Sequence, residues 1–288
     1  MEGRRLSGAR RLLAATGLLA LAGCSAVDLL NVAAPVADTR TADEIAYGAG
    51  ERRRLDVYGP PADAARPAPV VVFFYGGRWS RGERADYAFV GATLAAHGLV
   101  VVIPDYRLYP EVRFPAFVED GAAAVRWTRD HIARFGGDPG RIYLMGHSAG
   151  AHIAVLLALD RRYLAGAAPA GAIGLAGPYD FLPLEAADLR DLFGPPERFP
   201  RSQPIEYARG DAPPLLLLHG LDDDTVWPRN SRNLAAAVRA RGGRAETRFY
   251  EDLGHAGIVG ALSGPLDFLA PVRADVLAFI ERATTAAR

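Results

Sequence analysis

Residues 146–150 (Gly-His-Ser-Ala-Gly) have the residue types and spacing of a nucleophilic serine site. They follow an apolar run at 141–145 and precede an alanine-rich run at 151–159, so the sequence predicts a strand, a Gly-x-Ser-x-Gly turn and a helix. The glycines permit a sharp turn that lifts the serine hydroxyl away from the strand end. The helix N-terminus favours negative charge beside it. We therefore predict Ser148 as a catalytic nucleophile.

A serine nucleophile needs a base that takes its proton and an acid that orients the base. After an elbow of this kind the acid, and then the histidine, follow the serine along the chain. Four of the six histidines precede or adjoin Ser148, and His219 precedes the obvious acids, which leaves His255 as the base. Three adjacent aspartates, 222–224, follow the apolar run 215–218. Position alone does not choose the acid among them.

An oxyanion hole requires backbone N–H groups directed at the developing negative charge. The amide of Ala149, directly after the serine, is one candidate donor. Gly76 and Gly77 follow the apolar run 70–75, and two glycines allow the backbone to approach a substrate closely. We predict that these three residues form the oxyanion hole, with a simple turn at Gly76 and Gly77 as the alternative.

The composition excludes several other chemistries. The 288 residues include no lysine, so a Schiff-base lysine, a Ser–Lys dyad and a phosphate-loop lysine are impossible. Cys24 is the single cysteine, so neither an intrachain disulfide nor a cysteine metal cluster can form. The formal net charge is +0 and no basic stripe is present, which argues against a nucleic-acid partner.

Apolar runs that alternate with helical patterns predict the elements that position these residues. Strands are expected at 54–58, 70–75, 99–103, 141–145, 172–176, 215–218 and 245–250, and helices at 87–97, 117–135, 151–159, 230–241 and 271–283. This alternation indicates an α/β fold with a mostly parallel central sheet flanked by helices. The sequence shows no internal repeat and no second core, so we expect one catalytic domain over residues 46–288.

Residues 179–211 interrupt the alternation. The segment is rich in Pro, Asp, Glu and Arg, with a helical pattern near 184–193. Irregular segments of this length are usually functional. We expect a small cap over the site, with a plain surface insertion as the alternative.

Large side chains near the site are candidates for the substrate pocket. Trp79 and the cap residues Phe181, Leu182 and Phe193 could line an acyl or alcohol pocket, or could form only the core of the cap. Arg78 would favour anionic substrates if its side chain reaches the pocket rather than solvent.

Residues 1–23 have the pattern of a lipoprotein signal. An arginine-rich start precedes an apolar stretch, 12–22, that is too short to span a membrane. Residues 21–24 (Leu-Ala-Gly-Cys) resemble a bacterial lipobox. An ordinary secretory signal or an uncleaved anchor is the alternative. We expect a lipid on Cys24 to anchor the exported protein to the bacterial cell envelope. In Gram-negative lipoproteins an aspartate after the lipidated cysteine usually signals retention in the inner membrane. Ser25 occupies this position, which favours the outer membrane. Residues 24–45 have few periodic apolar positions and are predicted as a tether.

These features together resemble the α/β-hydrolase carboxylesterases with an HGG-type oxyanion loop. That branch includes hormone-sensitive-lipase-like, BD-FAE-like and kynurenine-formamidase-like enzymes. Residues 75–79 (YGGRW) are similar to its HGGxW loop, 104–110 (PDYRLYP) to its DYRLxP segment, and 219–226 (HGLDDDTV) to its HGxxDxxV motif. The resemblance covers about residues 55–280, nearly the whole chain after the tether.

The resemblance implies an α/β-hydrolase fold and a Ser148–Asp223–His255 triad, because Asp223 occupies the aspartate of HGxxDxxV. It also implies hydrolysis of a small-molecule carboxylic ester through an acyl-enzyme, with no metal or organic cofactor. One residue departs from the family: Tyr75 replaces the leading histidine, whose role is to hold the loop by hydrogen bonding. A tyrosine hydroxyl would have to do so from further away.

Three alternatives remain open at the level of sequence. An amidase of the kynurenine-formamidase type has the same loop, but such enzymes act in the cytoplasm and a lipoprotein signal argues against it. A dipeptidyl-peptidase-like exopeptidase usually carries a large N-terminal propeller, which this chain lacks. A non-catalytic binding module of the same fold usually loses a triad member, whereas Ser148, Asp223 and His255 are all present.

Overall fold

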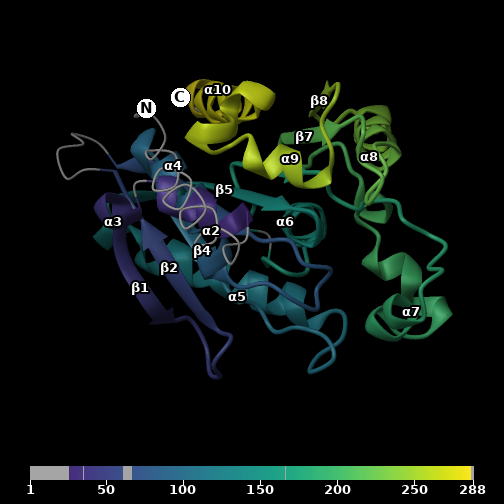
Figure 1. The fold of residues 1–288 in the computed structure, drawn as a ribbon. Helices are drawn as coiled ribbons and strands as arrows, with labels where there is room; N and C mark the ends of the chain where they lie inside the picture. The colour runs from purple at the N-terminus through teal and green to yellow at the C-terminus, as the bar shows by residue number, and fades with distance from the viewer. Residues whose placement is uncertain (1–25, 35, 61–66, 166, 287–288) are drawn as a thin grey trace, which may run out of the picture.

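A twisted sheet of eight strands forms the centre of the molecule (Figure 1). The computed structural model describes residues 26–34, 36–60, 67–165 and 167–286. The strand order is β1-β2-β4-β3-β5-β6-β7-β8; the pairs β1–β2 and β2–β4 are antiparallel, and all the others are parallel. The strands are β1 (Arg40–Ala46), β2 (Arg54–Tyr58), β3 (Ala68–Phe74), β4 (Val100–Pro104), β5 (Gly137–His147), β6 (Gly171–Leu175), β7 (Leu215–Gly220) and β8 (Ala245–Tyr250).

The central strands are buried on both faces, as their unbroken apolar runs predict. Val71 on β3, Val102 on β4 and Leu217 on β7 are completely buried. β-branched and large aliphatic side chains fit a pleated surface that is covered on both sides. The edge strand β8 is less buried, with buried residues at its two ends only. The mostly parallel sheet predicted from the sequence is confirmed.

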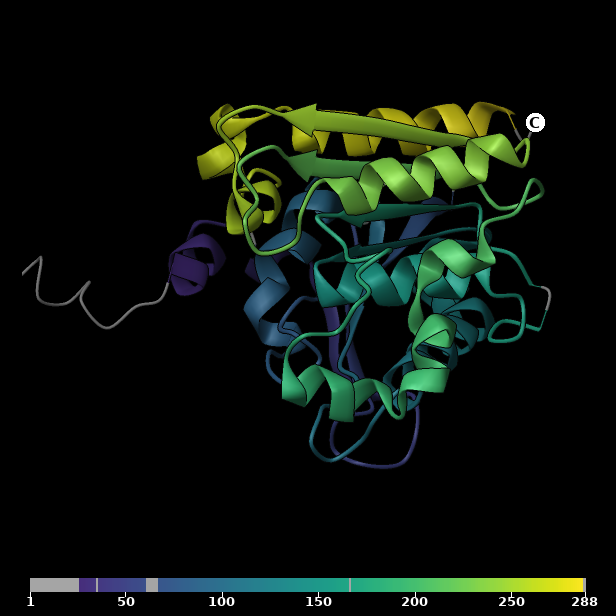
Figure 2. The same cartoon turned by 90° about the vertical axis from the view of Figure 1, so that its right-hand side faces the viewer.

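Helices cover both faces of the sheet. α5 (Ala116–His131), α6 (Ala149–Leu159) and α8 (Arg229–Ala240) lie on one face, and α4 (Ala88–Ala96) and α10 (Val272–Ala286) lie on the other (Figures 1 and 2). Every residue of α6 is buried, because this helix packs against β5 and β6 and also contacts α5 and the cap. An apolar side chain is therefore suitable at almost every position of α6, and its alanines allow close packing.

The N-terminal part of the described chain differs from the expected tether. Residues 26–46 form two helices, α2 (Ala26–Ala33) and α3 (Val36–Thr39), and the antiparallel edge strand β1. The Asn31 side chain accepts a hydrogen bond from the Phe89 amide at 2.8 Å and donates to the Ala85 carbonyl at 3.0 Å, which joins α2 to α4 and to the 3₁₀ helix Arg84–Tyr87 before it. Leu30, Val36 and Ile45 also pack against the hydrophobic core. The segment is therefore held by apolar packing as well as by backbone pairing and polar contacts, although its apolar positions are too few to predict it from the sequence.

The segment 179–211 lies beside the carboxyl ends of the strands. It contains α7 (Ala187–Phe193) and two short 3₁₀ helices, Pro196–Ser202 and Pro204–Tyr207 (Figure 2). Two arginine–aspartate pairs fix α7 to the body of the domain: Arg78 with Asp188, and Arg113 with Asp191, at 2.9 and 2.7 Å. We refer to residues 179–211 as the cap.

The predicted signal peptide, 1–23, and Cys24 lie outside the described residues. Within the described ranges, none of the helices has both the length and the apolar character needed to cross a membrane.

Candidate active site

Ser148 stands at the sharp turn between β5 and α6. Its backbone adopts φ 54° and ψ −121°, a conformation that L-residues rarely take. A Cβ at Gly146 would lie 2.3 Å from the Gly150 backbone, and one at Gly150 would lie 2.0 Å from the Phe74 carbonyl oxygen. Both positions therefore require glycine. The turn has the strained strand-to-helix geometry of a nucleophile elbow.

His255 reaches Ser148 from the far end of the chain. It follows β8 and, in contrast to the expected loop, is the first residue of the short helix α9 (His255–Gly260). Its Nε2 lies 2.9 Å from Ser148 Oγ, and its Nδ1 lies 2.8 Å from Asp223 Oδ2. If Nδ1 carries the proton and donates to the carboxylate, Nε2 is free to accept the serine proton.

Asp223 differs sharply from its two aspartate neighbours. Asp222 and Asp224 are exposed, whereas Asp223 is 4% exposed. Its second oxygen, Oδ1, accepts hydrogen bonds from the amides of Thr225 at 3.0 Å and Val226 at 2.8 Å. Burial alone would raise the pKa of Asp223, but the hydrogen bonds that it accepts from two histidines and a backbone amide hold that pKa well below its usual range. Its carboxylate is thus ionised and fixed in place.

His219 contacts Asp223, although the sequence did not predict it as a site residue. Its Nε2 lies 2.7 Å from the Val226 carbonyl oxygen and 3.2 Å from Asp223 Oδ2. Both partners are acceptors, so Nε2 carries the proton, and Nδ1 accepts from the Ser231 hydroxyl at 2.8 Å. This buried imidazole therefore holds the loop that carries the carboxylate. The sequence did contain a signal for His219, because it is the first residue of the HGxxDxxV motif. It was not predicted because the histidines were considered only as candidates for the catalytic base.

The predicted oxyanion residues lie beside the serine. Gly77 and Ala149 both line the pocket into which Ser148 opens. Gly76 is not among the residues that line this pocket, but it packs against the elbow, since a Cβ there would lie 2.9 Å from His147 Nδ1 and 3.2 Å from Ser148 Cβ. Gly77 has φ 129°, and a Cβ on it would collide with the Arg81 carbonyl oxygen at 2.1 Å. The loop therefore requires both glycines.

Tyr75 fixes the start of the loop that carries Gly76 and Gly77. Its hydroxyl donates to Asp105 Oδ1 at 3.0 Å and accepts from Arg52 at 2.8 Å. The Tyr106 hydroxyl donates to the Tyr75 carbonyl oxygen at 2.8 Å, and the two rings stack with centroids 4.6 Å apart. Burial strongly raises the pKa of Tyr75, so its hydroxyl stays protonated and can donate. A buried polar network thus replaces the histidine that leads the family's loop.

His147 contacts the backbone of His255. Its Nε2 lies 3.0 Å from the His255 carbonyl oxygen, and the two imidazole centroids are 4.8 Å apart. Burial lowers the pKa of His147 to about 3, so the ring is neutral near pH 7. A neutral ring can donate from Nε2 to that carbonyl and does not place a positive charge against His255.

A pocket of about 650 Å³ opens from Ser148 and His255. Trp79, Phe181 and Arg78 line it, as proposed from the sequence. Arg78, however, forms a bidentate pair with Asp188, with nitrogen–oxygen distances of 2.9–3.1 Å, so its charge is already balanced. Phe193 is buried behind Trp79 with ring centroids 4.9 Å apart, and therefore supports the pocket rather than lining it.

Several further pocket residues were not singled out from the sequence. They share an apolar character and lie after β7 or in the cap: Trp227, Val226, Leu184, Leu189 and Pro183. Trp227 is 55% exposed, which is unusual for so large an apolar side chain and is consistent with a place at a pocket mouth. Within the described residues, no group of three or more His, Cys, Asp or Glu side chains could hold a metal ion.

Three side chains that converge at the carboxyl ends of β5, β7 and β8, on a mostly parallel eight-stranded sheet, define the α/β-hydrolase class. A family model of BD-FAE matches residues 55–238, well over half of the chain. The chain therefore belongs to the BD-FAE family, among the α/β-hydrolase carboxylesterases, and the resemblance inferred from its motifs is confirmed.

The curated relatives include esterases from plants and bacteria. Isoprenylcysteine alpha-carbonyl methylesterase ICME of Arabidopsis thaliana is 32% identical over 238 residues, which cover 73% of this chain and 55% of that protein. Esterase LipC of Mycobacterium tuberculosis is 32% identical over 220 residues, which cover 68% of this chain and 54% of that protein. The chain thus spans about half the length of these relatives.

Solved structures agree on the fold. A truncated carbohydrate esterase from gut microbiota superposes with a TM-score of 0.76 at 23% identity, over 88% of this chain and 99% of that one. The propionate-bound thermophilic esterase Est2 of Thermogutta terrifontis has a TM-score of 0.64 at 26% identity, over 78% and 87% of the two chains. Another structure of that esterase is described as phosphorylated by paraoxon.

Proposed function

We propose that the protein hydrolyses small-molecule carboxylic esters through an acyl-enzyme on Ser148. The observation that carries the proposal is the continuous series of contacts from Asp223 through His255 to Ser148, at 2.8 and 2.9 Å, at the floor of an open pocket. Nucleophile, base and orienting acid are each within hydrogen-bonding distance of the next, as the mechanism requires. The esterases among its relatives support an ester rather than another acyl substrate.

In the first half-reaction His255 Nε2 accepts the Ser148 proton while Oγ bonds to the ester carbonyl carbon. Asp223 holds the proton on Nδ1 and stabilises the imidazolium that forms. The carbonyl oxygen becomes an alkoxide, which the amides of Gly76, Gly77 and Ala149 stabilise. When the C–O bond breaks, His255 returns the proton to the leaving alcohol, and the acyl group remains on Ser148.

In the second half-reaction water replaces the alcohol. His255 removes a proton from the water, the hydroxide oxygen bonds to the acyl carbon, and the same amides stabilise the second alkoxide. Its collapse breaks the bond to Oγ, and His255 returns the proton to Ser148. The carboxylic acid leaves and the free enzyme is restored.

Substitution of Ser148 by Ala tests the proposal. We expect hydrolysis of p-nitrophenyl acetate, butyrate and octanoate by wild type, and loss of that activity in Ser148→Ala. The free energy of unfolding should stay within about 1 kcal/mol, because alanine removes one oxygen from a position at the pocket surface. Paraoxon should inactivate the wild type stoichiometrically. Equal rates of hydrolysis in wild type and variant would overturn the proposal. If wild type hydrolysed an anilide but none of the esters, the amidase alternative would be favoured.

We also propose that residues 1–23 are a lipoprotein signal and that Cys24 carries the lipid anchor. The arginine-rich start, short apolar stretch and Leu-Ala-Gly-Cys sequence support it. Helix α2 begins at Ala26, so little chain would separate the lipid from the folded domain. Expression in a Gram-negative host with labelled palmitate tests the proposal: label should enter wild type and not Cys24→Ser. A protein released unlabelled from the envelope would contradict it.

A further inference from the structure

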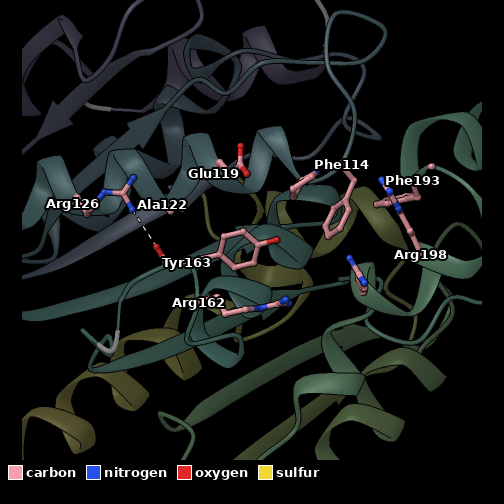
Figure 3. A pocket seen from close by; sticks show the side chains of 11 residues that line it. Phe114, Glu119, Ala122, Arg126, Arg162, Tyr163, Phe193 and Arg198 are labelled. Carbon is pink, nitrogen blue, oxygen red and sulfur yellow. Dashed lines mark hydrogen bonds between the residues drawn. The ribbon is translucent and has the colours of Figure 1, made fainter.

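A second pocket lies beside the catalytic one, between α5, residues 162–163 and the cap (Figure 3). Its volume is about 450 Å³, and none of its lining residues lines the catalytic pocket. Phe193 forms part of its wall and also packs against Trp79, with ring centroids 4.9 Å apart. The two pockets are therefore separate sites that share an aromatic wall.

The lining of the second pocket is strongly basic. Arg126, Arg162, Arg198 and Arg201 all line it, and Glu119 is the one carboxylate among its described lining residues. Arg162 is neutralised by Asp160, which is buried and lies 2.8 Å from the guanidinium Nε. Even if Glu119 balances another arginine, two positive charges remain in excess. A protein with a formal net charge of +0 concentrates positive charge here.

Arg198 and Arg201 contribute this excess from the cap. Both belong to the 3₁₀ helix Pro196–Ser202 and are exposed. Within the described residues, neither guanidinium forms an ion pair or a side-chain hydrogen bond. Arg78 and Arg113, which also contact the cap, are by contrast held in bidentate pairs with aspartates. The guanidinium groups of Arg198 and Arg201 are therefore available to a ligand.

The remaining walls are apolar. The Phe114 and Tyr163 rings are half-buried, and Ala122 on α5 is 2% exposed. Figure 3 shows the Tyr163 ring between α5 and the Arg162 side chain, so that aromatic surface and guanidinium groups face the same space. A ligand that satisfied both would combine an anionic group with a flat apolar body.

We propose that this pocket binds a small organic anion, with a carboxylate, sulfonate or phosphate group held by Arg198 and Arg201 and an apolar body against Phe114 and Tyr163. Guanidinium forks match the geometry of such oxyanions in a bidentate manner. The half-buried aromatic walls add apolar contact area. Because Arg198 and Arg201 are exposed, the ionic contact is screened by salt, and the apolar contact must contribute to affinity. This site is independent of the chemistry at Ser148.

Calorimetric titration with naphthalene-2-sulfonate tests the proposal, because its uncharged sulfonamide has nearly the same shape. Wild type should bind the sulfonate, more weakly as salt is added, and bind the sulfonamide at least about tenfold more weakly. The double variant Arg198→Gln/Arg201→Gln should lose at least about tenfold in sulfonate affinity. The control Arg241→Gln/Arg244→Gln removes the same charge from exposed arginines outside both pockets and should bind as wild type does.

Two further readouts keep the test decisive. Arg126→Gln alters the α5 side of the pocket without touching the cap, and should also weaken sulfonate binding. The variant Arg198→Gln/Arg201→Gln should hydrolyse p-nitrophenyl acetate as fast as wild type does. This result would show that its catalytic pocket is intact. The proposal would be overturned if wild type did not bind the sulfonate, or if it bound the sulfonate and the sulfonamide equally. It would also be overturned if the loss of Arg198 and Arg201 left sulfonate binding unchanged.

Discussion

Asp223 is distinguished from Asp222 and Asp224 by burial and by the number of hydrogen bonds that it accepts. If it orients His255, Asp223→Asn should lower kcat by about 10³–10⁴-fold, because an amide can donate to Nδ1 and stabilise the wrong tautomer. The neighbouring substitution Asp224→Asn changes an exposed carboxylate and should leave kcat within about twofold of wild type.

Steady-state kinetics on p-nitrophenyl butyrate measure both variants. Thermal unfolding of each confirms that the comparison is made on folded protein. A similar, small loss in the two variants would show that Asp223 is not the orienting acid and that Asp222 or the His219 contact must be reconsidered.

Tyr75 tests whether a hydroxyl replaces the loop histidine of the family. Tyr75→Phe removes the donor to Asp105 and the acceptor for Arg52 while keeping the ring stack on Tyr106. Unfolding free energy should fall by about 1–3 kcal/mol, since a buried carboxylate loses one donor. Because the loop carries Gly76 and Gly77, kcat should also fall while KM changes little. Urea unfolding and steady-state kinetics measure the two effects; loss of stability with full kcat would confine Tyr75 to a structural role.

At the scale of elements, His152 connects helix α6 to the cap. Its Nε2 lies 2.7 Å from the Ser202 carbonyl oxygen, and its ring is enclosed by aromatic side chains that include Trp79 and Phe181. Among the described residues Nδ1 has no hydrogen-bond partner. Burial lowers the pKa of His152 to about 4, although the Ser202 carbonyl opposes this shift.

This depressed pKa makes stability depend on pH. Between about pH 6.5 and pH 4 the unfolded chain binds a proton at residue 152 that the folded chain does not, so stability falls as the pH falls. From pH 7 to pH 5 the loss from His152 is about 2 kcal/mol. His152→Gln keeps a donor for the Ser202 carbonyl but has no group that titrates in this range. Between pH 7 and pH 5 the variant should therefore lose about 2 kcal/mol less unfolding free energy than wild type does. Urea unfolding at both pH values measures it; equal losses would contradict the assignment.

The elements differ in how far the sequence predicts them. The buried strands β3, β4 and β7 and the glycine-ended helices α4 and α8 lie within a few residues of their predicted bounds, because unbroken apolar runs and helix stops are local signals. β1 was not predicted, because an edge strand held by one neighbour needs no apolar face. The start of α9 at His255 was also missed, since its six residues are fixed by contacts with β7 and not by periodicity.

The proposed catalytic residues also differ in how far the sequence predicts them. Ser148 and His255 follow from motif and chain order, and Asp223 follows from the family resemblance, because local sequence treats three aspartates alike. Burial separates them, and burial is a property of the folded chain. His219 lies near the end of β7 and Trp227 in the loop that follows. The folded loop brings the Val226 carbonyl back to His219 and places Trp227 at the pocket.

At the scale of the molecule, the parallel part of the sheet explains why residues more than 100 positions apart can meet. β5, β7 and β8 all end at one edge, so the loops that follow them converge there. The cap lies over the same edge and closes one side of the catalytic pocket, while its outer part forms the second, basic pocket. One insertion thus shapes two neighbouring binding sites.

The antiparallel edge of the sheet leads to the last prediction. Removal of residues 26–46 would take away β1, its pairing with β2 from Arg40–Tyr58 to Ala46–Arg54, and the Asn31 contacts to α4. It would also expose Asp56, which is buried and accepts the Glu44 amide at 3.0 Å. Several hydrogen bonds of about 0.5–1.5 kcal/mol each are lost, so a chain that starts at Tyr47 should be less stable by at least about 2 kcal/mol.

Urea unfolding should compare the chain from Tyr47 with the chain from Ala26, and Asn31→Ala in the longer chain should give a smaller loss than the truncation. The proposed catalytic residues follow β5, β7 and β8, at the opposite part of the sheet order, so kcat for p-nitrophenyl butyrate should change less than the unfolding free energy does. Equal stability of the two chains would restore the tether interpretation, since a tether contributes nothing to the fold. A lower stability would instead place these residues within the catalytic domain and move its N-terminal boundary from residue 46 towards residue 26.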